Sequence, residues 1–210
     1  MKDTGEGRST TYIDTPNGII TEKGTWFRTR ENSLKEFAGE LLDHESVKKL
    51  LSSADLWLSF PSNLSLWLIP IALWQLNPFI ATGSILLLYM LLRISGPFYT
   101  SHSLSFIPSL LNHLGLQAVL YFFFLTILLQ SGLYSTAILG FILFVLFRWG
   151  VIKKMADPVV NAVNGKIYKV SYEDKVLRSV IVKKSMKYRT TLKEVNDIES
   201  SVMRKIVGRQ

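Results

Sequence analysis

The feature that most constrains this chain is a run of 101 residues without an acidic side chain. From residue 56 to residue 156 there is no Asp or Glu, and the only formal charges are Arg93, Arg148, Lys153 and Lys154. The whole chain of 210 residues, by contrast, has 24 basic and 16 acidic side chains and a net charge of +8. Because charged side chains are normally spread over a water-facing surface, this segment is a candidate for a membrane.

Two long apolar stretches fill the segment, from about residue 56 to 94 and from about 114 to 152. Each approaches twice the roughly 20 residues that one spanning helix needs. Both have a break near the middle: Asn77-Pro78, where proline disfavours helix, and the turn signal 131–135. We therefore predict four short transmembrane helices in two helical hairpins, at 56–76, 79–94, 114–131 and 135–152. The alternative is two long, tilted or kinked helices.

Helix length and apolarity bear on how these segments meet a bilayer. Windows such as 118–125 are apolar all round, which disfavours burial in a soluble core with one polar face. The last three predicted helices have 16–18 residues, or roughly 24–27 Å against ~30 Å of hydrocarbon. Either the bilayer thins locally, or the hairpins dip in and return.

Charge placement predicts the orientation. Every basic residue lies in a tail or at a helix end next to a tail or the central loop, so the positive-inside rule predicts that both termini are cytoplasmic. The loop 95–113 is cytoplasmic with four passes and external with two, and Arg93 favours four. The polar first 25 residues predict no cleavable signal peptide. The predicted interfacial anchors are Trp57, Arg93, Arg148 and Trp149 on the inner side and Trp74 and Tyr134 on the outer side.

The N-terminal region, 1–55, is predicted to be cytoplasmic. Asn17-Gly18 between alternating runs predicts a β-hairpin within 11–27, packed on a strand candidate at 166–172 or on a partner; a partly ordered arm is the alternative. Amphipathic helices are expected within 33–53, one opened by the capping box Ser33-x-x-Glu36 and a second near 45–53. These two helices are expected to be separate from the first apolar helix.

The C-terminal region, 153–210, is predicted to be a basic helical tail, with turns at 157–158 and 164–165. It contains seven basic residues without an intervening acid: Lys175, Arg178, Lys183, Lys184, Lys187, Arg189 and Lys193. Beside a membrane such a run attracts anionic lipid at ~1 kcal/mol per residue, and a protein partner is the other candidate. A solvated tail without a ligand is the alternative. Nucleic acid is disfavoured, because only Tyr188 is available for base stacking.

No catalytic, cofactor-binding or metal-ligating residue is predicted. The chain has no cysteine, which removes thiolate chemistry, and it contains no phosphate loop, His-Glu-x-x-His pair or calcium loop. His102 and His113 are eleven residues apart without a nearby acid, so we interpret them as interfacial polar residues. Without a carboxylate in the apolar region, ion-coupled transport is also disfavoured.

The layout over about 56–152, two long hydrophobic hairpins between cytoplasmic tails, resembles that of membrane-curving hairpin proteins such as reticulons. The resemblance is one of architecture, without a shared motif. The leading hypothesis is a non-enzymatic integral membrane anchor, scaffold or accessory subunit of a membrane complex, with a protein partner or homo-oligomer. The alternatives are a membrane-shaping hairpin protein and a small facilitative transporter or membrane enzyme.

Overall fold

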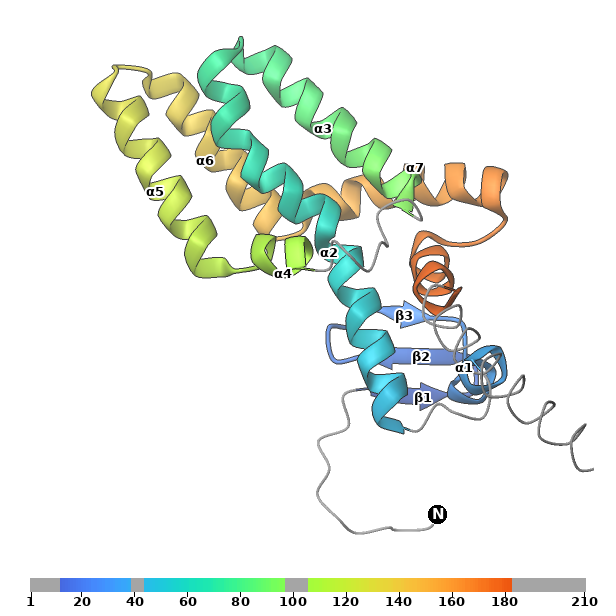
Figure 1. The fold of residues 1–210 in the computed structure, drawn as a ribbon. Coiled ribbons are helices and arrows are strands. Elements are labelled where there is room, and N and C mark those ends of the chain that lie inside the picture. The colour runs from blue at the N-terminus through green and yellow to red at the C-terminus, as the bar shows by residue number, and fades with distance from the viewer. Residues whose placement is uncertain (1–11, 39–43, 97–105, 183–210) are drawn as a thin grey trace, which may run out of the picture.

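The computed structural model of the chain describes residues 12–38, 44–96 and 106–182. It is mainly helical, with a small three-stranded sheet near the N-terminus. Figure 1 shows a helical bundle at one end of the molecule and the sheet at the other, with helix α2 (His44–Gln75) running from one into the other. This arrangement creates a junction between bundle and sheet.

The sheet consists of β1 (Tyr12–Thr15), β2 (Gly18–Thr21) and β3 (Trp26–Phe27), which pair antiparallel in the order β1-β2-β3. The predicted hairpin is present: Thr15 pairs with Gly18 across the two-residue turn 16–17. β3 adds a third strand. The expected further strand at 166–172 is wrong, because residues 166–168 are helical and residue 172 begins another helix.

The two N-terminal helices are α1 (Glu31–Ala38) and α2 (His44–Gln75). α1 begins at Glu31, so the predicted capping box at Ser33 does not open it. The predicted separation of helices 45–53 and 56–76 is also wrong. The linking residues 52–55, Ser-Ser-Ala-Asp, contain no glycine or proline to break the helix, and α2 is continuous.

Proline occurs twice inside α2, at Pro61 and Pro70. A proline has no N–H to donate to the carbonyl four residues earlier. For Pro70 that carbonyl belongs to Leu66, and it accepts a hydrogen bond of 2.7 Å from the Tyr121 hydroxyl. The helix therefore continues through Pro70 while α5 supplies the missing donor.

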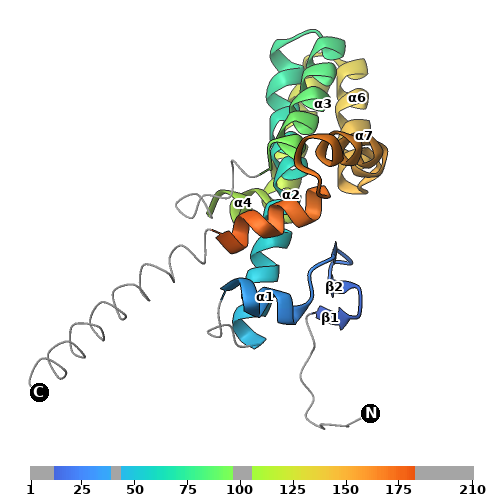
Figure 2. The ribbon, with the colours of Figure 1, turned by 90° about the vertical axis from the view of Figure 1, so that its right-hand side faces the viewer.

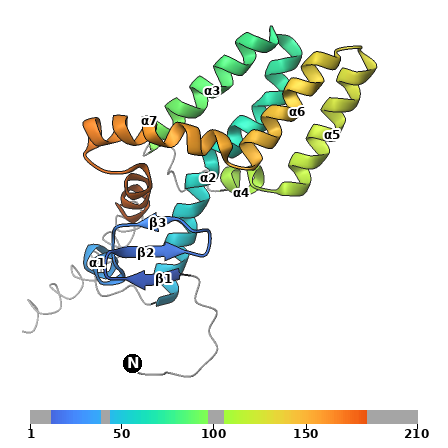
Figure 3. The ribbon, with the colours of Figure 1, turned by 180° about the vertical axis from the view of Figure 1, so that it is seen from behind.

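The bundle contains α2, α3 (Pro78–Ile94), α5 (Leu114–Gln130) and α6 (Tyr134–Arg148). The predicted bounds of α3 and α5 agree with the structure to within one residue, whereas α6 ends four residues before the predicted end. Asn77 Oδ1 accepts a hydrogen bond of 3.0 Å from the Phe79 amide at the start of α3. The turns α2–α3 and α5–α6 lie at the same end of the bundle (Figure 1 and, from behind, Figure 3), so the two stretches are hairpins, not long single helices.

At the other end of the bundle lie α4 (Phe106–Leu111) and α7 (Val151–Tyr168). Gly150, with φ of 70°, connects α6 to α7, and the two helices meet at a bend of 64°. The predicted turns at 157–158 and 164–165 are wrong, because α7 runs through both. Residues 172–182 are helical and lie between α7 and the sheet (Figure 2).

Length and composition support fewer spanning helices than the four predicted. Among the described helices, α2 alone is long and apolar enough to cross a bilayer. α6 and α7 together meet the same requirement only if they are counted as one bent span. α3 and α5 are apolar, but each has 17 residues.

Candidate functional site: a polar junction below the helical bundle

The junction is the region where the bundle helices end and meet α7, the helix 172–182 and the sheet. Arg93 lies in the last turn of α3 and Arg148 in the last turn of α6. α7 then brings Lys153 and Asp157 under the bundle (Figure 1). Arg93, Arg148 and Lys153, three of the four charges of the acid-free segment, thus lie at the junction with Asp157, the first acid after the segment.

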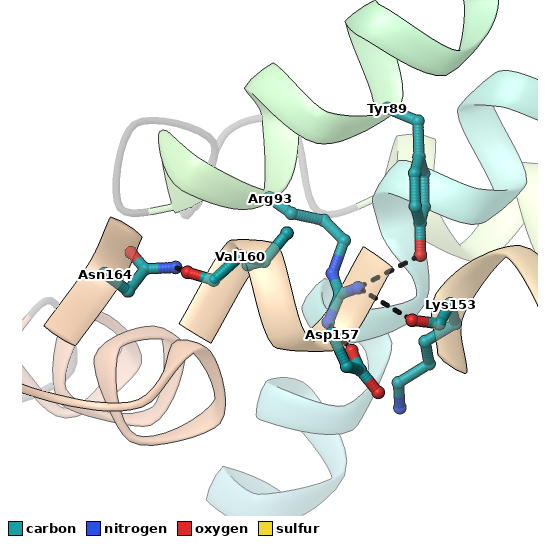
Figure 4. A network of polar contacts seen from close by, with 6 residues as sticks. All are labelled: Tyr89, Arg93, Lys153, Asp157, Val160 and Asn164. Atoms are coloured by element: carbon teal, nitrogen blue, oxygen red, sulfur yellow. Dashed lines mark hydrogen bonds and ion pairs between the residues drawn. The ribbon is translucent and has the colours of Figure 1, made fainter. Parts of the chain in front are cut away.

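Arg93 is at the centre of a buried cluster (Figure 4). Its side chain is only 2% exposed, and Nη2 lies 2.5 Å from Asp157 Oδ1. Nη1 donates to the Tyr89 hydroxyl at 3.3 Å and to the Lys153 carbonyl at 3.4 Å. Its guanidinium carbon also lies 4.8 Å from the centre of the Tyr172 ring. The cluster therefore joins α3, α7 and the helix 172–182.

Arg93 was predicted to be an interfacial anchor that reaches water, and the structure places it differently. α7 packs across the end of α3 and covers the guanidinium, and Asp157 supplies the compensating charge. A buried cation needs such a partner because its desolvation is expensive. The Arg93 side chain therefore holds α3 against α7, and it is too deeply buried to contact a ligand.

Lys175 is also buried, at 5% exposure. Its ammonium donates to Asn164 Oδ1 at 2.5 Å and to the Ile94 carbonyl, and lies 4.0 Å from the centre of the Tyr168 ring. Burial lowers the pKa of Lys175 to about 8. Figure 4 shows Asn164, whose Nδ2 donates to the Val160 carbonyl at 2.9 Å.

This placement removes Lys175 from the predicted lipid-facing set, because its ammonium points into the protein. Arg178 is exposed on the next turn of the helix 172–182. The other predicted contacts lie outside the described residues: Lys183, Lys184, Lys187, Arg189 and Lys193.

Beside the Arg93 cluster, the junction contains a cavity of about 480 Å³, which we call the basic cavity. It lies between the sheet, α2 and the bend from α6 to α7. Its polar lining includes three cations and one carboxylate, and its apolar lining comes from α2 and α6. The lining residues are Lys23, Thr25, Asp55, Leu58, Ser59, Ser62, Asn63, Leu66, Asn112, Phe147, Arg148 and Lys153.

Asp55 is the least solvated charged group of this cavity, at 7% exposure. Its Oδ1 has no hydrogen-bond partner within the described ranges. Burial raises the pKa of Asp55, while the hydroxyls of Thr25 and Thr21 and the charges of Lys23 and Lys153 act in the opposite direction. A buried acceptor without a donor is rare in folded proteins, so this oxygen marks a place where a ligand group could bind.

The other predicted interfacial anchors differ in how exposed they are. Trp74 and Tyr134 are exposed near the two turns, and Trp149 is exposed at the junction. Trp57 is buried, and Arg148 is exposed on the rim of the basic cavity. His113 caps α5 by accepting from the Leu116 amide at 3.3 Å; His102 lies outside the described residues.

The sequence did not predict that several residues would meet at the junction. Asp157 was interpreted as part of a turn, and nothing local links it to Arg93, 64 residues away. Tyr89 and Arg93 do have the i, i+4 spacing of one helix face. The box Ser171-x-x-Asp174 was a recognisable start signal for the helix 172–182: the Asp174 amide donates to Ser171 Oγ, and Asp174 Oδ1 accepts from the Arg28 amide.

The junction is lined mainly by hydrogen-bond donors. In the part of the chain that the structure describes, no three His, Cys, Asp or Glu side chains come together in a metal-binding group. The basic cavity instead offers cations, hydroxyls and amides, which are donors for an anion. Comparison with known proteins adds no relative, since no family model, curated protein or solved structure matches the chain.

Proposed function

We propose that the chain is a non-enzymatic integral membrane protein, an anchor or scaffold subunit of a membrane complex. The four-helix bundle lies in the bilayer as two short hairpins. The junction, the sheet and both termini lie on the cytoplasmic side, where the sheet holds a protein partner and the basic tail faces the anionic membrane surface.

The observation that carries this proposal is the outer surface of the bundle. Large apolar side chains are exposed on α3, α5 and α6, although each of these helices also has a buried face. An exposed apolar surface of this kind is typical of a membrane or protein contact, and is rare on a soluble monomer. The exposed side chains include Phe79, Ile80, Leu87, Val119, Phe122, Phe123, Ile138 and Phe141.

The distribution of charge supports the orientation. Arg93 and Arg148 both lie at the junction end, and the two turns at the other end carry no charge. Basic residues favour the cytoplasmic side. Helices of 17 residues are about 25 Å long, which favours a bilayer that thins around the bundle.

The sheet supports the scaffold role. Ile13 pairs with Ile20, and Ile20 pairs with Trp26, so the three side chains form a row across one face of the sheet. Ile13 and Trp26 are exposed, whereas Ile19 and Phe27 on the opposite face are buried. The outward row is suited to an apolar contact with a partner.

The chain has no cysteine, so single-cysteine labelling tests the topology without background. Cysteine is placed at Ser131 in the α5–α6 turn, at Gly165 on α7 and at Ser103 in the central loop. In intact cells we expect a membrane-impermeant maleimide to label only position 131, and to label 103 and 165 after permeabilisation. Labelling of 103 from outside would contradict the two-hairpin placement, and release of the chain by alkaline carbonate would contradict membrane insertion.

The scaffold role is tested separately by co-purification in mild detergent. We expect Ile13→Glu to abolish recovery of a stoichiometric partner, or of a second copy of the chain. Asp14→Lys, on the other face of β1, is the matched control and should leave recovery unchanged. A wild-type chain that purifies as a monomer without a partner would overturn the scaffold role and leave the membrane placement intact.

A further inference from the structure

We propose that the basic cavity binds the headgroup of one phospholipid, with the phosphodiester held by Arg148, Lys153 and Lys23 and a headgroup ammonium or hydroxyl directed at Asp55. This inference rests on the proposed membrane placement, which puts the cavity at the depth of the headgroups. It goes beyond a general attraction of the basic tail to an anionic surface, because it names a defined site and a required donor.

The cations of the cavity are available for an anion. Lys23 comes from the turn before β3, Arg148 from the end of α6 and Lys153 from the first turns of α7. Within the described ranges none of them lies within 4.0 Å of a carboxylate, unlike Arg93, which is paired with Asp157. Three unpaired cations around one cavity favour a phosphate group.

Asp55 makes the site selective. Its Oδ1 lacks a donor, and an anion without a donor group would leave it unsatisfied and repel it. A headgroup with an ammonium, as in phosphatidylethanolamine, or with hydroxyls, as in phosphatidylglycerol, supplies the missing hydrogen bond. The quaternary ammonium of phosphatidylcholine has no N–H to donate, so it satisfies the cations and leaves Asp55 without a bond.

The position and size of the cavity fit a headgroup. Leu58, Leu66 and Phe147 line it from bundle helices, whereas Lys23 and Thr25 line it from the sheet side. Its volume of about 480 Å³ lies in the range of roughly 300–1,000 Å³ typical of ligand sites. A phosphate here would have apolar side chains on the bundle side, where acyl chains begin, and donors on the side facing water.

The experiment is native mass spectrometry of the full chain released from nanodiscs that contain phosphatidylethanolamine, phosphatidylglycerol and phosphatidylcholine in equal amounts. We expect one molecule of the first two lipids to be retained about tenfold over phosphatidylcholine, the value of one charge-assisted hydrogen bond. Lys153→Gln and Arg148→Gln should each lower retention about tenfold. Lys154→Gln, an exposed neighbour outside the cavity lining, is the matched control and should have no effect.

Asp55→Asn tests the selectivity. The amide can donate to a phosphate, so we expect phosphatidylcholine to be retained as well as the other two lipids. Water-soluble glycerophosphoethanolamine, added as a competitor, distinguishes the source of the phosphate. Its failure to displace the lipid at millimolar concentration supports a lipid ligand, and full displacement would overturn the lipid assignment in favour of a soluble phosphodiester.

Equal retention of all three lipids by the wild type, or equal losses from Lys154→Gln and Lys153→Gln, would overturn the inference. Flotation of the same samples with liposomes separates this failure from failure of the proposed function. A chain that floats but shows no lipid preference contradicts the cavity site alone. A chain that does not float contradicts the membrane placement, and with it this inference.

Discussion

The two halves of α2 lie in different surroundings, although they form one helix. Residues 44–55 bury Val47, Leu50 and Leu51 and expose His44, Glu45, Lys49 and Ser52, as a helix on a soluble domain does. Residues 56–75 also have a buried face but expose Ile71 and Trp74. The change occurs next to Asp55 and the junction. Both halves therefore have a buried face, and they differ in the polarity of the exposed face. That polarity indicates whether water or lipid is the favoured surrounding of each half.

The largest effect is expected where the two regions are joined. Asp157→Ala leaves the guanidinium of Arg93 buried without a carboxylate. We expect the free energy of unfolding in detergent to fall by about 3–5 kcal/mol, the usual effect of breaking a buried ion pair.

The matched control is Asp14→Ala, which removes an exposed carboxylate on β1 and should change stability little. The double variant Arg93→Met/Asp157→Ala should recover part of the loss, since no unpaired charge remains. A double variant as unstable as the single one would show that the pair is not what joins the regions.

The second effect tests the two exposed surfaces directly. Phe122 is at the centre of α5 and is 75% exposed, and Ile167 on α7 is 61% exposed. In a bilayer, Phe122→Lys should disfavour insertion by roughly 2.5–3.5 kcal/mol, whereas Ile167→Lys, at the junction end, should be nearly neutral. The measurement is the membrane-inserted fraction after carbonate extraction. Equal insertion of both variants would remove the distinction between the two regions.

The third effect should be confined to the sheet. A Cβ added at Gly18 would lie 2.1 Å from the Phe27 carbonyl oxygen, whereas a Cβ at Gly83 on α3 meets nothing within 4 Å. Gly18→Ala should destabilise the sheet by about 1–3 kcal/mol, and Gly83→Ala should not destabilise the bundle. Amide hydrogen exchange should rise for residues 12–27 and stay constant in α5 and α6. A rise in both regions would mean that the sheet and the bundle unfold as one unit.

The smallest effect is a pH dependence at the junction. The pKa of Lys175 is lowered to about 8 in the folded chain from 10.5, so between these values the unfolded chain binds more protons. Raising the pH through this interval therefore favours the folded state. The gain is about 1 kcal/mol between pH 7.5 and pH 9. Tryptophan fluorescence during chemical unfolding measures it, and the gain should vanish in Lys175→Met; an unchanged slope in that variant would assign the effect to another group.

Local signals predicted the secondary structure well where they were strong. Asn77-Pro78 marks the end of one helix and the start of the next. Asn17-Gly18 predicted the β-hairpin, although its two-residue turn lies one residue earlier, at 16–17, and Gly18 begins β2. The weaker signals were misleading. Asp157-Pro158 was interpreted as a turn, because a proline inside a helix removes one backbone hydrogen bond, yet α7 continues through it to Tyr168.

The junction could not be predicted in the same way. Arg93 meets Asp157 and Lys175 meets Ile94, over separations of 64 and 81 residues. Hydropathy and spacing describe each helix by itself and contain no information on how α7 crosses the bundle. The basic cavity has the same origin, since Lys23 lies more than 120 residues before Arg148 and Lys153 in the sequence.

The pairing of Arg93 with Asp157 also has a consequence for the order of events during synthesis. When the first hairpin has emerged, the chain contains no further acid until Asp157, so no downstream carboxylate can yet reach the guanidinium. The second hairpin and the beginning of α7 must be translated first. Until then Asp157 is absent as a partner for Arg93, and the junction closes only after both hairpins have been synthesised.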